Sequence, residues 1–413
     1  MSTSTGLRIA IVGAGAAGYF AAINAARTFP NARIELLEAT RQPLYKVGVS
    51  GGGRCNVTHH CFDIDRLLQG YPRGFKELIG PFQRFQPRDT VQWFESRGVR
   101  LTAEDDGRMF PVTDDSATII ACLQHSADTA GVTLRLHARV TGISRDNDES
   151  PTFRINFKGG TSTEFDRVLL ATGSSPIGYE IASSLGHKII PPVPSLFTFK
   201  IKDERLHGLS GISFPDVALT LEVGDNTLEQ RGPLLITHWG LSGPAVLKLS
   251  AWGARLLFTT RYQAILRVNL LPEQSLATIE ENLHRYRVAH PRRAITAHPL
   301  YDLPRRYWER IVAGSAITPE LTWSHITREQ QSALVEQLAN ARFAITGKGE
   351  FKDEFVTAGG VRLKEVDFRT MGSRLCPGLY FAGEILDIDG ITGGYNFQAA
   401  WSTGWVAGES IGR

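Results

Sequence analysis

The segment LRIAIVGAGAAG, Leu7 to Gly18, decides the fold. Its first seven residues form an apolar run that is typical of a buried parallel strand. The run leads into a G-x-G-x-x-G turn, and the stretch AAGYFAAINAARTF then predicts a helix that stops at Pro30. A second apolar strand, RIELLE, ends on Glu38. This order of strand, glycine turn, helix, strand and acid predicts a Rossmann-like dinucleotide-binding unit.

Each part of this unit has a physical reason. Gly13 permits the tight turn, Gly15 lets the backbone approach a pyrophosphate, and Gly18 lets the helix pack closely on the strand. The helix N-terminus offers free N–H groups and a positive dipole end to the phosphates. Glu38 is expected to accept hydrogen bonds from the adenosine ribose, and its charge disfavours a 2′-phosphate. The expected cofactor contacts in this unit are Gly13, Ala14, Gly15, Ala16, Ala17, Gly18, Glu38 and Ala39.

The C-terminal segment distinguishes FAD from NAD. LYFAGE predicts a short strand that ends at Gly383 and Glu384, and a glycine pair then opens a helix rich in small and aromatic residues. Glu384 is expected to accept from the ribityl chain, and the helix N-terminus is expected to stabilise negative charge on a reduced flavin. The strand VLLATG is expected to return the chain to the cofactor. The expected cofactor is therefore FAD, with contacts from Val140, Ala171, Thr172, Gly173, Gly383, Glu384, Gly393, Gly394, Tyr395 and Asn396.

The stretch KVGVSGGGRCNVTHHC, residues 46–61, permits a phosphate cradle, a redox dithiol or a metal site. Its cysteines and histidines have no partner pair at finger spacing, so we expect no metal. Five residues separate Cys55 from Cys61, whereas disulfide reductases use four and carry a second nucleotide domain. We interpret the stretch as a loop close to the flavin end of FAD, where Cys55 is either reactive or, as we favour, small enough to fit. Its expected contacts are Lys46, Ser50, Gly51, Gly52, Gly53, Arg54, Cys55 and Asn56.

Six segments carry a family resemblance. They are VGAGAAG, PLYKVGVSGGGRCNVTH, GRMFPVTDDSATI, LLATG, ITHWGLSGPAVLKLS and PGLYFAGEILDIDGITGGYNFQAAWSTGWVAG. The chain resembles the bacterial flavoproteins labelled NAD(P)/FAD-dependent oxidoreductases, which include proteins named aminoacetone oxidase and BaiN-type bile-acid dienone reductase. The resemblance runs from the first strand to the last helix, and it implies FAD, a redox fold and an inserted domain. It does not name the substrate, because the proteins within the family differ in chemistry.

Composition sets the broader class. The 413 residues allow two or three domains, and the hydrophobic content of 42% is typical of a globular protein. A net charge of +3 is too small to imply nucleic acid by itself, and four cysteines indicate a reducing compartment. The N-terminus lacks signal-peptide features, and no apolar run reaches the roughly 18 residues that cross a bilayer. We therefore expect a cytoplasmic protein with no membrane partner.

Residues 191–342 are expected to interrupt the cofactor domain. SLFTFKI, DVALTLEV, GPLLITH and YQAILRVNL predict short strands, and three helical patterns follow them, the last with a capping box of Thr327 and Gln330. We expect an α/β fold: an FAD-binding domain in two parts, 1–190 and 343–413, and an inserted β-barrel or sheet with attached helices. Substrate is expected to lie between the insert and the flavin.

The segment THWGLSGPAVLKL is the part of the insert with chemical character. Ser242 is expected to cap a helix whose first turn includes Pro244. His238 precedes that helix and is a candidate proton donor, although a structural loop histidine is the favoured interpretation. Pro244 stands where a G-x-S-x-G elbow needs glycine, which argues against a hydrolase. The candidate catalytic residues are therefore His238 and Cys55.

These patterns predict an FAD-dependent oxidoreductase that acts on a small organic substrate by hydride transfer. The chain has no second G-x-G-x-x-G unit, so NAD(P)H is expected to bind only transiently, and oxygen is the other candidate for reoxidation. The alternative is a flavoprotein with a nucleic-acid-binding or tRNA-modification role through the segment Arg285–Arg310, which is rich in arginine and aromatic residues. No zinc-finger spacing, RNP signature or long basic run supports it, so nucleic acid is not the expected partner.

Overall fold

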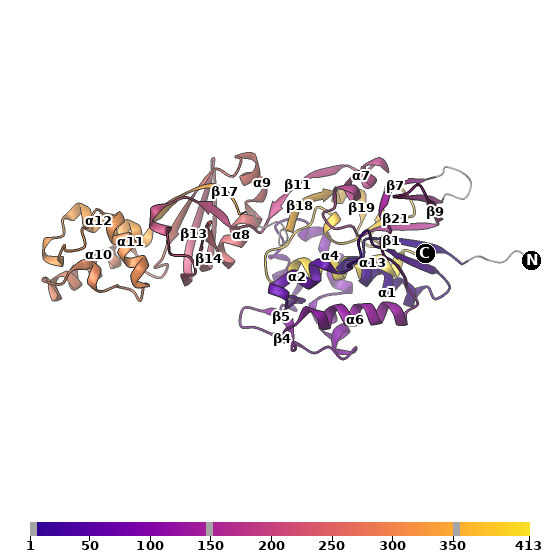
Figure 1. Cartoon of the computed structure of the whole chain (residues 1–413), viewed down its shortest axis with the longest axis horizontal. Coiled ribbons are helices and arrows are strands. Elements are labelled where there is room, and N and C mark those ends of the chain that lie inside the picture. The colour runs from indigo at the N-terminus through magenta and orange to yellow at the C-terminus, as the bar shows by residue number, and fades with distance from the viewer. Residues whose placement is uncertain (1–5, 146–151, 350–355) are drawn as a thin grey trace, which may run out of the picture. The chain divides into compact units, whose positions relative to one another are not determined.

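The computed structural model describes residues 6–145, 152–349 and 356–413. The chain forms two compact units: unit 1 comprises residues 1–194 and 351–413, and unit 2 comprises residues 195–350 (Figure 1). The boundaries expected from the sequence lie at 190/191 and 342/343. The second of these falls inside strand β17, Ala341–Lys348, which is a strand of unit 2.

A seven-stranded sheet forms the centre of unit 1, in the order β19-β20-β21-β10-β1-β2-β6. The five strands from β21 to β6 are parallel, and Ile9, Ala10 and Ile11 of β1 are fully buried, as an apolar run in a parallel sheet requires. The Rossmann-like α/β prediction is confirmed. The strands are β1 Arg8–Val12, β2 Arg33–Leu37, β6 Thr133–Arg135, β10 Arg167–Leu170, β19 Val366–Asp367, β20 Gly372–Ser373 and β21 Leu379–Phe381.

The helices α1 (Ala16–Thr28) and α13 (Tyr395–Ser410) pack in direct backbone contact. A Cβ at Gly404 would lie 2.7 Å from the Ala17 carbonyl oxygen, and a Cβ at Gly408 would lie 2.7 Å from that of Ala21. Both distances are shorter than any side chain tolerates. This close packing holds the N-terminal and C-terminal helices of unit 1 together.

Smaller elements complete unit 1. Along the chain, two three-stranded antiparallel sheets, β3-β5-β4 and β7-β8-β9, and the pair β11-β18 lie between strands of the central sheet. Asp115 caps α6 by accepting the Ala117 N–H at 2.8 Å. The strands are β3 Thr58–His59, β4 Leu101–Ala103, β5 Arg108–Pro111, β7 Val140–Arg145, β8 Phe153–Phe157, β9 Ser162–Phe165, β11 Ile189–Ser195 and β18 Val356–Val361; the helices are α2 Tyr45–Gly53, α3 Ile64–Leu68, α4 Phe75–Arg84, α5 Pro87–Glu95, α6 Ser116–Thr129 and α7 Pro176–Ser184.

Unit 2 contains a closed six-stranded barrel and a group of helices. The barrel order is β12-β15-β14-β13-β16-β17, and β13 alternates buried and less buried residues along most of its length, as a barrel wall requires. The predicted barrel-like insert with attached helices is confirmed, as is the capping box of Thr327 and Gln330. The remaining elements are β12 Phe199–Ile201, β13 Ser213–Val223, β14 Asn226–Thr237, β15 Gly240–Ser242, β16 Ala264–Asn269, α8 Pro244–Trp252, α9 Ala254–Thr259, α10 Leu276–Ala289, α11 Arg305–Gly314 and α12 Arg328–Ala339.

Among residues 6–145, 152–349 and 356–413, no helix combines the length and apolarity that crossing a bilayer needs.

Candidate cofactor site

The first glycine turn has two glycines that the protein itself requires and one that it does not. A Cβ at Gly13 would lie 2.5 Å from the Ala171 carbonyl oxygen, and a Cβ at Gly18 would lie 1.9 Å from that of Gly13. A Cβ at Gly15 would meet nothing within 4 Å. Gly15 is the N-cap of α1, and no side chain caps this helix end. The turn therefore presents free N–H groups to open space, as an anion cradle does.

Glu38 is fixed beside this turn. One carboxylate oxygen accepts the Ala14 N–H at 3.2 Å, and the other accepts the Thr40 N–H at 2.9 Å. The backbone of Glu38 pairs with that of Arg135 and Ala138, just before Val140 in β7. These bonds hold the carboxylate at the carboxyl end of β2, where a ribose hydroxyl would reach it.

The glycine-rich stretch forms a left-handed turn within α2. Ser50 has extended backbone angles (φ −66°, ψ 150°), and Gly51 and Gly52 have φ of 59° and 70°. Side chains at Gly52 and Gly53 would point into open space, so the backbone is bare there. Arg54 does not offer a free charge, because its guanidinium pairs with Glu104 at 2.8 Å and with Asp114 at 3.3 Å.

This turn is joined to the N-terminus of α13. In the amide orientation that satisfies both groups, Asn56 donates to the Thr58 carbonyl and accepts the Gly394 N–H, each at 3.1 Å. The His59 ring nitrogen Nδ1 lies 3.0 Å from the Gly393 carbonyl oxygen, and the ring stacks on Tyr395 at 4.7 Å. No side chain caps the first turn of α13. Its next N–H groups therefore remain available to a negatively charged ring edge.

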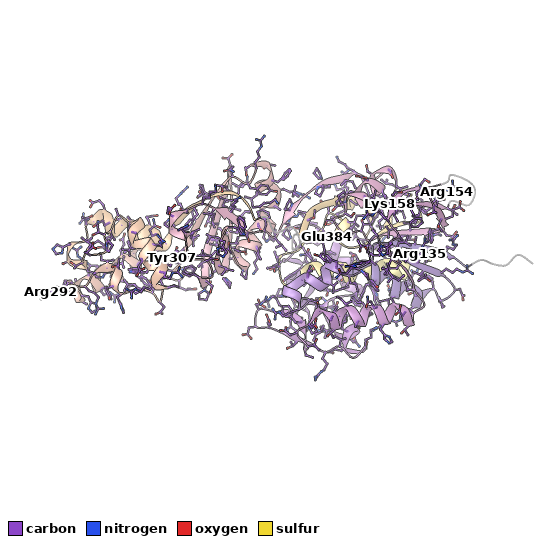
Figure 2. All side chains as sticks on the ribbon, in the orientation of Figure 1. Arg135, Arg154, Lys158, Arg292, Tyr307 and Glu384 are labelled. Carbon is purple, nitrogen blue, oxygen red and sulfur yellow. The ribbon has the colours of Figure 1, made fainter. Side chains whose placement is uncertain are left out.

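A charged pair lies where the carboxyl ends of β10 and β21 meet. Lys46 Nζ donates to Glu384 at 2.5 Å and to Ser174 Oγ at 3.3 Å, and Glu384, which is labelled in Figure 2, also accepts the Thr357 N–H at 3.0 Å. Thr172 and Gly173 follow β10 at the same edge, and a Cβ at Gly173 would lie 3.6 Å from a Glu384 oxygen. The structure adds Ser174 and Thr357 to the candidate site. In the sequence, their only signal was that Ser174 follows ATG and Thr357 lies close to a glycine pair.

Unit 1 therefore brings together most of the predicted cofactor residues. Leu44 N–H donates to the Ala14 carbonyl at 2.8 Å, so the glycine-rich stretch starts against the first turn. A Cβ at Gly383 would lie 2.8 Å from Ala17 Cβ, which places the C-terminal strand end at the start of α1. Residues more than 350 positions apart thus share one edge of the sheet.

The cysteines separate by burial. Cys55 has φ of 62° and is fully buried, and burial raises the pKa of its thiol from 9.0 to about 12. Such a thiol holds almost no thiolate at neutral pH. Cys61 is half-buried, and both cysteines are free thiols. No cluster of three or more His, Cys, Asp or Glu among the described residues is arranged to hold a metal ion.

The candidate proton donor of the insert lies in unit 2. His238 is exposed in the turn between β14 and β15, and not directly before a helix as the sequence suggested. The predicted Ser242 cap is wrong: Gly243, with φ of 97°, is the N-cap of α8. Ser242 Oγ instead accepts a 2.9 Å hydrogen bond from Thr198 Oγ1, because β15 carries Ser242 into the barrel ladder.

The arginine-rich segment is partly committed to structure. Arg305 pairs with Glu309 at 3.0 Å, and Arg306 and Arg310 donate to the backbone carbonyls of Gly208 and His207. Residues 284–298 hold four arginines and three histidines and no acidic residue, and Arg285 among them pairs with Glu281 at 3.7 Å. Arg292 in this stretch is exposed (Figure 2).

The residues fit FAD. An uncapped helix N-terminus faces open space at Gly15, an acid lies at the ribose position, and a second uncapped helix N-terminus lies next to the glycine-rich turn. The buried Tyr179 hydroxyl has no partner among the described residues, and burial followed by the charge of Glu384 raises the pKa of Tyr179. A polar group entering beside Glu384 would satisfy it.

Comparison with known proteins agrees with this architecture. Residues 7–410 match the family described as HI0933-like protein Rossmann domain. Two relatives named ribosomal RNA dihydrouridine synthase, from Escherichia coli K12 and Haemophilus influenzae, are 33% and 30% identical over 97% and 98% of both chains. A 3-dehydro-bile acid delta(4,6)-reductase from Clostridium scindens is 29% identical over 98% of both chains. The solved E. coli quinol fumarate reductase, at 15% identity, shares the fold with a TM-score of 0.51 over 98% of this chain and 70% of that one.

Proposed function

This chain belongs to the HI0933-like Rossmann-domain family of FAD-dependent oxidoreductases, and we propose that it reduces uridine in ribosomal RNA to dihydrouridine. The observation that carries the proposal is full-length identity of 33% and 30% to two proteins named for that reaction. FAD, when bound, supplies hydride exchange between a nicotinamide donor and the substrate.

The three relatives suggest one shared chemistry. Dihydrouridine is uridine with the C5–C6 double bond of uracil reduced, and that bond is conjugated with a ring carbonyl. A 4,6-diene of a 3-dehydro steroid is likewise conjugated with a carbonyl. The balanced reaction adds one hydride and one proton across the double bond and converts one NAD(P)H to NAD(P)⁺. Polarisation by the carbonyl makes the distal carbon the hydride acceptor in both substrates.

The chain's own residues would bind and orient the cofactor. The N–H groups of the first turn of α1 would hold the pyrophosphate, and Glu38 would hold the adenosine ribose. Lys46 and Glu384 would contact the ribityl side, and the uncapped N-terminus of α13 would stabilise negative charge at the flavin ring edge. His238 is our candidate for the proton donor, and the buried neutral thiol of Cys55 favours a structural role for that residue.

Basic surface in unit 2 supports an RNA substrate. Residues 284–298 carry cationic and titratable side chains without an acidic residue, and Arg292 is exposed. Such a stretch is suited to phosphate contacts. A small conjugated enone is the second candidate substrate, and the bile-acid reductase relative favours it.

The test uses the purified holoprotein with both substrate classes. Anaerobic reduction by NADH and by NADPH is followed by addition of ribosomal RNA from a strain that lacks the gene, or of a conjugated 3-keto steroid. We expect flavin reoxidation by RNA and dihydrouridine in the digested RNA by mass spectrometry. Reoxidation by the steroid alone would favour the second candidate, and reoxidation only by oxygen would contradict both.

A further inference from the structure

An open groove on unit 1 has a composition that the cofactor site does not use. It has a volume of about 970 Å³ and is lined by the C-terminal part of α1, by α5 and α6, and by α13. The side chains that matter here are Arg27, Arg97, His125, Phe85, Trp93 and Trp405. We propose that this groove binds a single-stranded segment of RNA through its arginines and the half-buried Trp405 indole, an inference that rests on the proposed function.

Two guanidinium groups in the groove carry charge that no acid neutralises. Within the described part of the chain, neither Arg27 nor Arg97 has an acidic side chain within 4 Å. Both side chains line the groove, and the pKa of Arg97 is lowered by burial and then by the charge of Arg27. Two unneutralised cations in one groove repel each other, and a phosphate bound between them would relieve that repulsion.

Other charges of the groove are already committed. Arg84 pairs with Glu409 and also donates to the Arg369 carbonyl at 2.7 Å. Asp89 accepts the Gln86 N–H at 2.8 Å in a capping box at the start of α5. Its carboxylate is thus held at the helix end. Asp89 keeps its negative charge, because a backbone N–H does not neutralise a carboxylate, and Arg27 and Arg97 together outweigh it, with His125 exposed in the same groove.

The groove is also rigid and aromatic. The Arg97 guanidinium lies 3.9 Å from the centre of the Trp93 ring and donates to the Trp93 carbonyl at 2.9 Å. These two contacts fix its position. The Trp405 indole stacks on Phe85 at 4.6 Å with an interplanar angle of 21°, and it is half-buried. Guanidinium planes and aromatic rings are the surfaces on which unstacked RNA bases lie.

Position separates this groove from the cofactor turn. Ile23 and Arg27 lie in the last turns of α1, whereas the pyrophosphate turn lies at its first residue. At about 1.5 Å per residue, Ile23 and Arg27 lie about 12 and 18 Å along α1 from Gly15, and Trp405 lies about 15 Å along α13 from Tyr395, where the flavin end is expected. The reacting base would not occupy it. A strand that extends beyond the reacting base is the occupant that an open, cationic and aromatic groove of this size accommodates.

The test measures binding of a fluorescent 12-nucleotide oligouridylate to the FAD-loaded protein by anisotropy at several salt concentrations. The variant is Arg27→Ala/Arg97→Ala. The control is Arg154→Ala/Lys158→Ala, which removes the same charge from β8 and the turn after it (Figure 2). We expect about tenfold weaker binding for the groove variant alone. For this variant, the slope of the logarithm of affinity against the logarithm of salt concentration should become less steep by about 1.4. That is about 0.7 for each lost phosphate contact on a single strand.

Separate measurements report on folding and on the proposed chemistry. FAD content and the rate of flavin reduction by NAD(P)H should be unchanged in both variants. Equal loss of affinity in both variants, or displacement of the oligonucleotide by AMP at the groove, would overturn the RNA assignment. Groove-dependent binding without dihydrouridine formation would contradict the proposed function and leave the groove intact. Dihydrouridine formation with unaltered RNA affinity in the groove variant would overturn the groove assignment and leave the proposed function intact.

Discussion

Trp401 Nε1 donates a 2.9 Å hydrogen bond to the carbonyl oxygen of Val57, 344 residues away. Trp401 is fully buried in α13, and Val57 lies directly after the glycine-rich turn. The bond fixes the loop that follows Cys55 against the C-terminal helix, so two segments from opposite ends of the chain form one side of the cofactor site. Thr58 Oγ1 supports the same junction by donating to Gln398 Oε1 at 2.6 Å.

Backbone contact between α1 and α13 should make Gly408 intolerant of a side chain. Gly408→Ala places a Cβ 2.7 Å from the Ala21 carbonyl oxygen, and overpacking of this kind costs about 1–3 kcal/mol. Gly314→Ala in α11 is the matched control, because its Cβ would meet nothing nearer than Arg205 Cδ at 3.4 Å and should stabilise by about 0.4–1 kcal/mol. Denaturant unfolding of both variants measures this, and similar stabilities would contradict the close packing.

The buried ion pair of Arg73 and Asp389 should be sensitive to removal of one partner. Asp389 is fully buried, and Arg73 approaches it with two nitrogens. Arg73→Leu leaves a buried carboxylate without its main partner, for which we expect a loss of about 3–5 kcal/mol of unfolding free energy. Arg305→Ala removes an exposed pair with Glu309 and should cost less than about 1 kcal/mol. A small loss for Arg73→Leu would show that the pair is dispensable.

Cys55 should resist alkylation in the folded protein. Its thiol has a pKa of about 12 because of burial, so thiolate is scarce at pH 7 to 9. Cys61 is half-buried and should react first with iodoacetamide, as peptide mass spectrometry would reveal. Denaturation should make all four cysteines react alike. Modification of Cys55 at the rate of Cys61 would contradict the buried, neutral thiol.

The same thiol predicts a dependence of stability on alkaline pH. The folded pKa lies above the ordinary value of 9.0, so the unfolded chain loses its proton first. The stability contribution is therefore complete below pH 9 and declines as the pH rises from 9 towards 12. Cys55→Ala should show a shallower decline than the parent protein in unfolding experiments across this range. An identical decline would show that other groups account for it.

Glu38 should contribute to FAD affinity. A hydrogen bond to a charged group contributes about 1.5–3 kcal/mol, so Glu38→Ala should weaken FAD binding about tenfold or more. Glu35→Gln on the same strand alters a carboxylate that pairs with Arg135 at 3.0 Å and should leave FAD affinity unchanged. Fluorescence titration of flavin-free protein with FAD measures both. Unchanged affinity in Glu38→Ala would remove the ribose contact from the site.

The sequence by itself determined the class of fold and much of the cofactor site. Local rules suffice for the strand Arg8–Val12, the turn at Gly13 and the acid at Glu38, because an apolar run, a bare turn and a helix N-terminus act over a few residues. The barrel-like insert was also predictable, since alternating residues mark its strands. The bounds of the insert were less predictable, because the sequence of β17 is equally typical of a strand that returns to the cofactor domain.

Only the tertiary structure decided how the separated motifs are used. In the folded protein Arg54 pairs with Glu104 and Asp114, and Cys55 is buried. Ser242 lies in strand β15 and does not cap a helix. The tertiary structure also placed Trp93 and Trp405 with two arginines in one groove, although α5, α1 and α13 are far apart in sequence. Pairing, burial and groove formation depend on contacts across hundreds of residues, and no local pattern encodes those contacts.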